Sequence, residues 1–212
     1  MRWLSVFLPI TIFKQISSLG TVIEVREIFG QKKMDLDGYP QTNNHYLKYW
    51  KKLLNNYGLN IQKMSQVLVL GLGGGNLATI LENEIPMANT TFVELENEVV
   101  EAAKNFFGIS ENKMRKIVVS DAKIFMKKNI TKYDLIIVDL YSGDDVPSFV
   151  SSRNFLNQIR NSLKKNGSTI FNYASHSFRK PDFVRFESIL KTHFANVKKI
   201  NYVGHNFYLI SN

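Results

Sequence analysis

A short apolar stretch that runs into a cluster of glycines constrains the fold of this chain more than any other part of its sequence. Residues 67–70 are all Val or Leu, and glycines follow at positions 71, 73, 74 and 75. An unbroken run of such residues predicts a strand that is buried in a parallel sheet. Small and apolar residues resume at helical spacing from Leu77, so the glycines mark a tight turn between a strand and a helix. This unit is typical of nucleotide-binding α/β sheets, where a backbone without Cβ atoms lies close to the ligand.

An acidic residue ends the next predicted strand. Residues 90–94 read Thr-Thr-Phe-Val-Glu, and Glu94 lies 18 residues beyond Asn76. A carboxylate at this place can accept both hydroxyl protons of a ribose. The pattern therefore predicts a nucleoside-containing ligand, held by the backbone of Gly71, Gly73 and Gly75 and by the Glu94 carboxylate. The alternative is a tight turn with no ligand.

The remainder of the chain alternates between strand and helix patterns. Strands are predicted at 67–71, 90–94, 116–119, 134–139 and 168–173, and helices at 76–85, 97–107, 152–164 and 181–193. Two final strands, at 197–202 and 207–211, are joined by a turn. Five parallel strands followed by an antiparallel hairpin indicate an α/β protein with a Rossmann-like, doubly wound sheet.

The first 60 residues have a different pattern. Partial alternation predicts strands at 22–26 and 33–38, which form a small β-hairpin, and apolar residues on one face predict a helix at 46–57. We therefore expect an N-terminal element over residues 1–60 and a nucleoside-binding catalytic domain over residues 61–212. The apolar start resembles the beginning of a signal peptide, but Pro9 and the lack of an Ala-x-Ala site favour a packed segment.

Charge and cysteine content narrow the function classes. The chain has no cysteine, which removes disulfides and thiolate metal sites and fits a cytoplasmic location. Its formal net charge is +9, but no basic block exceeds two consecutive residues. We read the charges mainly as solvated faces and helix ends, with an acidic or nucleic-acid partner as the alternative. No apolar run is long enough to span a membrane. The four histidines show no ligand spacing, and no metal site is predicted.

Acidic residues follow three successive predicted strands. They are Glu94, Asp121 and Asp139, and ligands in such sheets bind outside the carboxyl ends of the strands. Three carboxylates at this edge suit a cationic nucleoside. Glu94 and Asp121 could instead cap the helices that follow them, and Asp139 could be an ordinary loop residue. Asp144 and Asp145 read as turn residues.

The ordered set of these motifs resembles the spermidine synthase family. The motifs are residues 67–75, Val93-Glu94-Leu95-Glu96, Ser120-Asp121-Ala122 and residues 133–139, with Leu36-Asp37-Gly38 and Gln41 upstream. The resemblance implies the class I S-adenosylmethionine-dependent methyltransferase fold. It also implies that S-adenosylmethionine or its decarboxylated form is the donor. It further implies that Glu94 binds the ribose, that Asp121 binds the adenine side, and that Asp139 is the catalytic base. Gln41 would lie on the substrate side.

Two positions depart from the pattern of that family. Gly74 stands where the family usually carries an aspartate, and Ser142 replaces the second acid of the family's Asp-Ser-Ser-Asp-Pro. Asp144 or Asp145 could substitute for that acid after a loop shift. Tyr141 and Ser142 are expected to line the acceptor pocket. The absence of an acid at Gly74 and the net charge together predict weak discrimination, within about tenfold, between intact and decarboxylated donors.

The leading hypothesis is a spermidine synthase-like transferase that moves an aminopropyl group from decarboxylated S-adenosylmethionine to a polyamine or related amine. The alternatives are a methyltransferase that acts on a small molecule or nucleic acid, and a nucleoside-binding module that has lost catalysis. The expected partners are a small-molecule amine and a second copy of the chain in a homodimer. Neither a membrane nor a metal ion is expected to take part.

Overall fold

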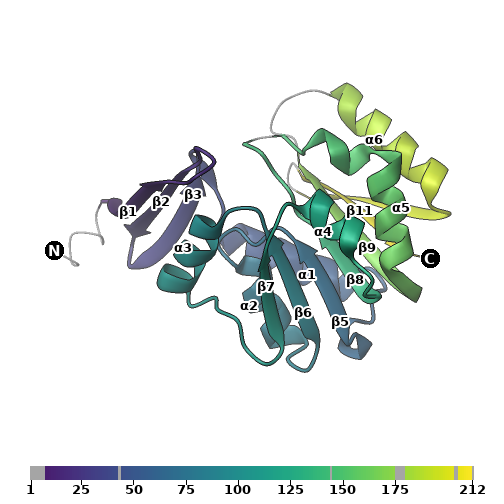
Figure 1. The fold of residues 1–212 in the computed structure, drawn as a ribbon, viewed down its shortest axis with the longest axis horizontal. Helices are drawn as coiled ribbons and strands as arrows, with labels where there is room; N and C mark the ends of the chain where they lie inside the picture. Colours follow the sequence, from purple (N-terminus) through teal and green to yellow (C-terminus); the bar gives the residue numbers. More distant parts are fainter. Residues whose placement is uncertain (1–7, 43, 144, 175–179, 203–204, 212) are drawn as a thin grey trace.

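The computed structural model of the protein describes residues 8–211 except 43, 144, 175–179 and 203–204 (Figure 1). Its larger sheet has seven strands. Its order is β10-β11-β9-β8-β5-β6-β7. The bounds are β5 Gln66–Leu70, β6 Asn89–Glu94, β7 Arg115–Val119, β8 Tyr133–Val138, β9 Leu163–Ala174, β10 Asn196–Tyr202 and β11 His205–Ser211. Strands β5 to β9 are parallel to one another, and β10 and β11 are antiparallel. The predicted doubly wound sheet with a closing hairpin is confirmed.

Helices cover both faces of this sheet. Alternate side chains of the central strand β5 point to opposite faces and therefore pack in two separate cores. Val67 and Val69 pack in one apolar core, and Leu68 and Leu70 pack in the other. The first core includes residues of α1 Asn44–Asn56, α2 Asn76–Glu84 and α3 Asn97–Phe107. The second includes residues of α4 Ala122–Lys128, α5 Arg153–Ser162 and α6 Lys180–His193. This two-sided burial explains why strand 67–70 has no polar residue.

The N-terminal sheet is larger than the predicted hairpin. Four antiparallel strands follow in sequence order, β1 Ile10–Ile16, β2 Val22–Ile28, β3 Gln31–Leu36 and β4 Tyr39–Pro40. Its buried residues Ile23, Val25 and Met34 pack on Val99 and Ala102 of α3, and Figure 1 shows the small sheet beside that helix. Strand β1 lies at the edge of this sheet, and most of its residues are exposed, although its Phe13 packs against the same core.

Helix α1 packs with the large sheet although it precedes β5 in the chain. Its Trp50 is buried in the first core and meets Phe207 of β11 edge-to-face, with ring centroids 5.3 Å apart. The division into residues 1–60 and 61–212 stays a prediction. Within the part of the chain that the structure describes, no helix is long and apolar enough to cross a membrane.

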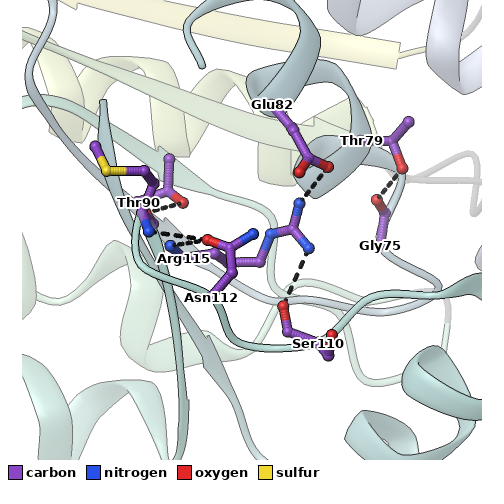
Figure 2. A network of polar contacts seen from close by, with 8 residues as sticks. Gly75, Thr79, Glu82, Thr90, Ser110, Asn112 and Arg115 are labelled. Carbon is purple, nitrogen blue, oxygen red and sulfur yellow. Dashed lines mark hydrogen bonds and ion pairs between the residues drawn. The ribbon is translucent and has the colours of Figure 1, made fainter. Parts of the chain in front are cut away.

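The edge strand β7 is tied to α2 by a buried arginine. Arg115 is 6% exposed, and its guanidinium donates to Glu82 Oε2 at 2.7 Å and to the Ser110 carbonyl at 3.1 Å (Figure 2). Asn112 Oδ1 accepts a hydrogen bond from the Arg115 backbone at 2.8 Å. A buried guanidinium needs such partners, since an unpaired buried charge is costly. This network joins the edge strand β7, which pairs with β6, to helix α2.

Candidate active site

The site lies where the strand order reverses, between β5 and β8. After β5 the chain turns toward β6, and the Gly71 N–H donates to the Val93 carbonyl at 2.8 Å. After β8 the Asp139 N–H donates to the Leu70 carbonyl at 2.9 Å. The diverging loops leave a cavity of about 380 Å³ at the carboxyl ends of the strands. This is the crevice in which doubly wound sheets bind their ligands.

Two glycines of the turn are required by their conformation and by their neighbours. Gly71 has φ of +102°, and a Cβ there would lie 2.1 Å from the carbonyl oxygen of Asp139. Gly73 has φ of +51°, and a Cβ there would meet Gln41 Oε1 at 2.9 Å. Both glycines and Gln41 line the cavity, and the contact of this backbone with a ligand stays a prediction.

The next two glycines face the protein interior. A Cβ on Gly74 would lie 2.1 Å from Thr42 Cγ2, and a Cβ on Gly75 would lie 2.3 Å from Ile109 Cγ1. Gly75 is the N-cap residue of α2 in the left-handed conformation, with φ of +81°. Neither residue is among those that line the cavity. The predicted ligand contact of Gly75 therefore stays a prediction, whereas its turn-forming role is clear.

Glu94 connects the glycine turn to the end of β6. Its Oε2 accepts hydrogen bonds from the backbone N–H groups of Leu72 at 3.0 Å and Gly73 at 3.2 Å. Its Oε1 accepts from Leu95 N at 2.8 Å. The N-cap residue of α3 is Glu96, so Glu94 does not cap that helix. The carboxylate lines the cavity beside the turn, where a ribose would lie in a sheet of this type.

Asp121 caps the helix that follows it. Its Oδ1 accepts from Lys123 N at 2.7 Å and from Ile124 N at 3.1 Å, at the start of α4. The residue also lines the cavity, so the cap fixes a carboxylate at the cavity wall. Capping and ligand binding are compatible here, because a carboxylate has more than one acceptor site.

Asp139 follows β8 in the wall of the cavity. Its Oδ1 accepts a hydrogen bond from Asn172 Nδ2 at 2.8 Å. Burial raises the pKa of this carboxyl to about 6, the Asn172 amide lowers it, and the nearby charge of Glu94 raises it. Such a group is largely ionised at neutral pH and can accept a proton, as a general base must.

The loop after Asp139 carries the two predicted acceptor-side residues. Tyr141 and Ser142 both line the cavity, and the Tyr141 hydroxyl donates to the Asn172 carbonyl at 3.1 Å. Ser142 N donates to the Asp145 carbonyl at 2.9 Å, which closes a tight turn. Asp145 is exposed and is not among the residues that line the cavity, and Asp144 lies outside the described residues.

The N-terminal sheet and its turns form the opposite wall. Thr21, Leu36, Asp37 and Tyr39 line the cavity there, and Thr21 Oγ1 donates to Glu96 Oε1 at 2.8 Å. Glu96 is 9% exposed, and its Oε2 is buried with no hydrogen-bond partner among the described residues.

Sequence reasoning missed two cavity residues with direct roles in this geometry, Asn172 and Glu96. Asn172 is concealed in a strand pattern, and no local spacing marks it as a partner of Asp139. Glu96 carried a signal, because it follows Glu94 by two residues in the segment that leads into α3.

The cavity is acidic although the chain is basic. Its described lining includes five carboxylates and no Lys, Arg or His. The carboxylates belong to Asp37, Glu94, Glu96, Asp121 and Asp139. A cavity with one sign of charge concentrates ligands of the opposite sign. Among the described residues, no group of three His, Cys, Asp or Glu side chains could hold a metal ion. The five carboxylates suit a ligand of positive charge.

Comparison with known proteins identifies one family. Residues 47–204 match the spermine/spermidine synthase domain. A polyamine aminopropyltransferase from Vibrio vulnificus is 27% identical over 141 residues, which are 65% of this chain and 47% of that protein. An eEF1A lysine and N-terminal methyltransferase from Xenopus laevis is 30% identical over 131 residues, which are 57% of this chain and 19% of that protein. The chain thus spans about half and about a fifth of the length of these relatives.

Solved structures share the fold. A spermidine synthase in complex with the transition state analogue AdoDATO aligns with a TM-score of 0.76 and 18% identity, over 95% of this chain and 72% of that one. Human methyltransferase-like protein 13 in complex with SAH aligns with a TM-score of 0.67 and 22% identity, over 80% of this chain and 82% of that one. The predicted methyltransferase-type fold is confirmed by both.

Proposed function

The chain belongs to the family of spermine/spermidine synthase domains, and from that premise we propose that it transfers an aminopropyl group from decarboxylated S-adenosylmethionine to a polyamine or related amine. The observation that carries the proposal is the acidic cavity, with five carboxylates and no described basic residue in its lining. Both substrates of this reaction are cations, and a carboxylate-lined cavity attracts them while it disfavours polyanions such as nucleic acid.

In this proposal the donor occupies one side of the cavity. The backbone of Gly71 and Gly73 would face its nucleoside, with Glu94 at the ribose hydroxyls and Asp121 at the adenine amine. Gly75 would support this side by starting α2. Tight positioning is the main requirement of the reaction, because the sulfonium already activates the adjacent carbon.

Asp139 would act on the acceptor. The amine nitrogen attacks the methylene carbon next to the sulfur, and the carbon–sulfur bond breaks with its electron pair going to sulfur. The nitrogen loses a proton, which Asp139 would accept. Gln41, Tyr141 and Ser142 would line the acceptor end of the cavity. The neutral thioether leaves as a methylthioadenosine.

A methyltransferase is the second candidate, favoured by one observation. Gly74 supplies no carboxylate, and a side chain at this position would point toward Thr42 and Met34. The donor's amine therefore lacks one acid that the family pattern provides. The homodimer and the cytoplasmic location stay predictions.

The test is to supply each donor with a panel of diamines and triamines and to identify the nucleoside product. Methylthioadenosine is expected with the decarboxylated donor, and Asp139→Asn should lower its formation by roughly 10² or more. S-adenosylhomocysteine from the intact donor would support the methyltransferase. Binding of either donor without turnover of any amine would support a nucleoside-binding module that has lost catalysis.

A further inference from the structure

Asn172 contacts the segment that carries Asp139 at two points. Its side-chain Nδ2 donates to Asp139 Oδ1 at 2.8 Å, and its backbone carbonyl accepts from the Tyr141 hydroxyl at 3.1 Å. The residue is 3% exposed and lies near the carboxyl end of β9, the strand that pairs with β8. A rigid strand therefore holds both the carboxylate and the loop that follows it.

The charge of Asp139 determines which end of the Asn172 amide faces it. An ionised carboxylate accepts hydrogen bonds only, so the amide must present its NH₂ group. The other end, Oδ1, is buried with no hydrogen-bond partner among the described residues. A buried acceptor without a partner costs free energy, and the hydrogen bond that the NH₂ group donates to Asp139 offsets part of this cost.

We propose that Asn172 is a positioning residue, whose amide stabilises Asp139 as an anion and fixes one of its oxygens in the cavity wall. This inference deepens the proposed function and rests on it, because it assigns how the base is kept ready to accept a proton. It adds a contact that removing Asp139 alone would not reveal.

Other titratable groups share the cavity with Asp139, and one of them, Glu94, acts on its pKa. Asp37, Glu94, Glu96 and Asp121 share the lining with Asp139, as do the phenols of Tyr39 and Tyr141. Glu94 opposes ionisation of Asp139 through its negative charge, and burial opposes it more strongly. The Asn172 amide is the hydrogen bond that lowers the pKa of Asp139 against both effects.

The direct test measures the titration of Asp139 in the protein without substrate. The carboxyl carbons of aspartate are labelled with ¹³C, the Asp139 resonance is assigned with Asp139→Asn, and its pKa is followed by NMR. Asn172→Leu has nearly the same shape but cannot donate a hydrogen bond. It should raise the pKa of Asp139 by about one pH unit. Asn172→Ala provides a second variant with a smaller side chain.

Two matched variants separate this effect from changes in packing. Thr169→Val alters another fully buried polar residue of β9, whose Oγ1 has no partner among the described residues. Tyr141→Phe removes the bond to the Asn172 carbonyl and leaves the amide in place. Neither variant should shift the pKa of Asp139 as the Asn172 variants do. An unchanged pKa in both Asn172 variants would overturn the proposal.

Kinetics then connect the amide to turnover. The ratio of wild-type to Asn172→Leu kcat/KM should be about threefold larger at pH 6.5 than at pH 8.5, because the variant base is ionised only at higher pH. A ratio independent of pH would contradict the role of the amide in turnover. If the NMR pKa shifts but the wild type turns over no amine, the proposed function fails and the contact stands.

Discussion

The methyl group of Thr42 occupies the space into which a side chain at position 74 would project. A Cβ added to Gly74 would lie 2.1 Å from Thr42 Cγ2, whereas its next neighbours, Thr42 Cβ and Met34 Cε, would be at 3.5 and 3.6 Å. Thr42 is itself fixed, because its hydroxyl accepts a hydrogen bond from Met34 N at 2.8 Å. The missing family acid is therefore matched by a neighbour that fills its place.

This pair gives a double-mutant prediction. Gly74→Ala should lower the free energy of unfolding by about 1–3 kcal/mol, the usual cost of overpacking. In a Thr42→Ser background the same change should cost under about 1 kcal/mol, since serine keeps the hydroxyl and removes only the clashing methyl. Urea titrations of the four proteins measure the coupling. Equal costs in both backgrounds would show that the loop moves instead.

The cavity lining revises the donor preference that the sequence suggested. The missing acid at Gly74 and the net charge predicted weak discrimination, but the described lining has no Lys, Arg or His to offset a donor carboxylate. We now expect the decarboxylated donor to bind more than tenfold more tightly than intact S-adenosylmethionine, because the carboxylates repel the extra negative charge. Competitive calorimetry on one protein sample measures the ratio. Equal affinities would show that the charge of the cavity does not discriminate between the two donors.

Ionisation of Asp139 should reduce the stability of the folded protein. Its pKa is raised in the folded state to about 6, so the unfolded chain ionises first as the pH rises. Stability from this group is present below the unfolded pKa of about 4 and is lost as the pH rises through 6. At pH 7.5, the free energy of unfolding of Asp139→Asn should therefore be about 1–3 kcal/mol higher than that of wild type.

The comparison at two pH values isolates the charge. At pH 4 the difference between Asp139→Asn and wild type should nearly vanish, because the wild-type carboxyl is protonated in the fold. Asp145→Asn removes an exposed carboxylate from the same loop and should change stability by less than about 0.5 kcal/mol. A destabilised Asp139→Asn at pH 7.5 would contradict the buried charge.

Glu94 should hold the ribose of the donor. Glu94→Gln keeps the shape but weakens charge-assisted hydrogen bonds, so nucleoside affinity should fall at least about tenfold. Glu101→Gln, on the exposed face of α3, removes the same charge outside the cavity and serves as the control. Binding is measured by calorimetry on folded protein.

A 2′-deoxy nucleoside separates ribose binding from support of the glycine turn. Wild type should prefer the ribonucleoside, and Glu94→Gln should lose most of that preference. If the preference persists in the variant, the carboxylate serves chiefly to anchor the backbone of Leu72 and Gly73.

Much of the large sheet could be predicted because its signals are local. The apolar run at β5, the glycines and the acids at strand ends all lie within short windows, and the structure places them at one edge of the sheet. Helix α4 was missed because it has only seven residues and its capping residue, Asp121, was read mainly as a ligand contact. Strand β1 was missed because its apolar start resembles a signal peptide.

The site was harder to predict where its contacts span the chain. Asp139 and Asn172 are 33 residues apart, and Gly74 meets Thr42 through the side of the loop that faces the N-terminal sheet. Periodicity shows which residues are buried, but it does not show which of them touch. The N-terminal sheet was predicted with two strands and has four. Its outer strands, β1 and β4, each pair with one inner strand, and the sequence pattern that predicts a hairpin lies in the inner strands β2 and β3.

Two separate sheets line the cavity. Mutations that change the N-terminal wall can therefore occur independently of mutations that change the strand ends of the large sheet. Residues on the N-terminal side, such as Leu36 and Tyr39, come from a different stretch of the gene than the strand ends of the large sheet. Substitutions at cavity-lining positions such as Leu36 and Tyr39 can alter the shape of that wall while the glycine turn and Glu94 stay intact. A lineage could in this way acquire a new amine substrate without rebuilding its donor site.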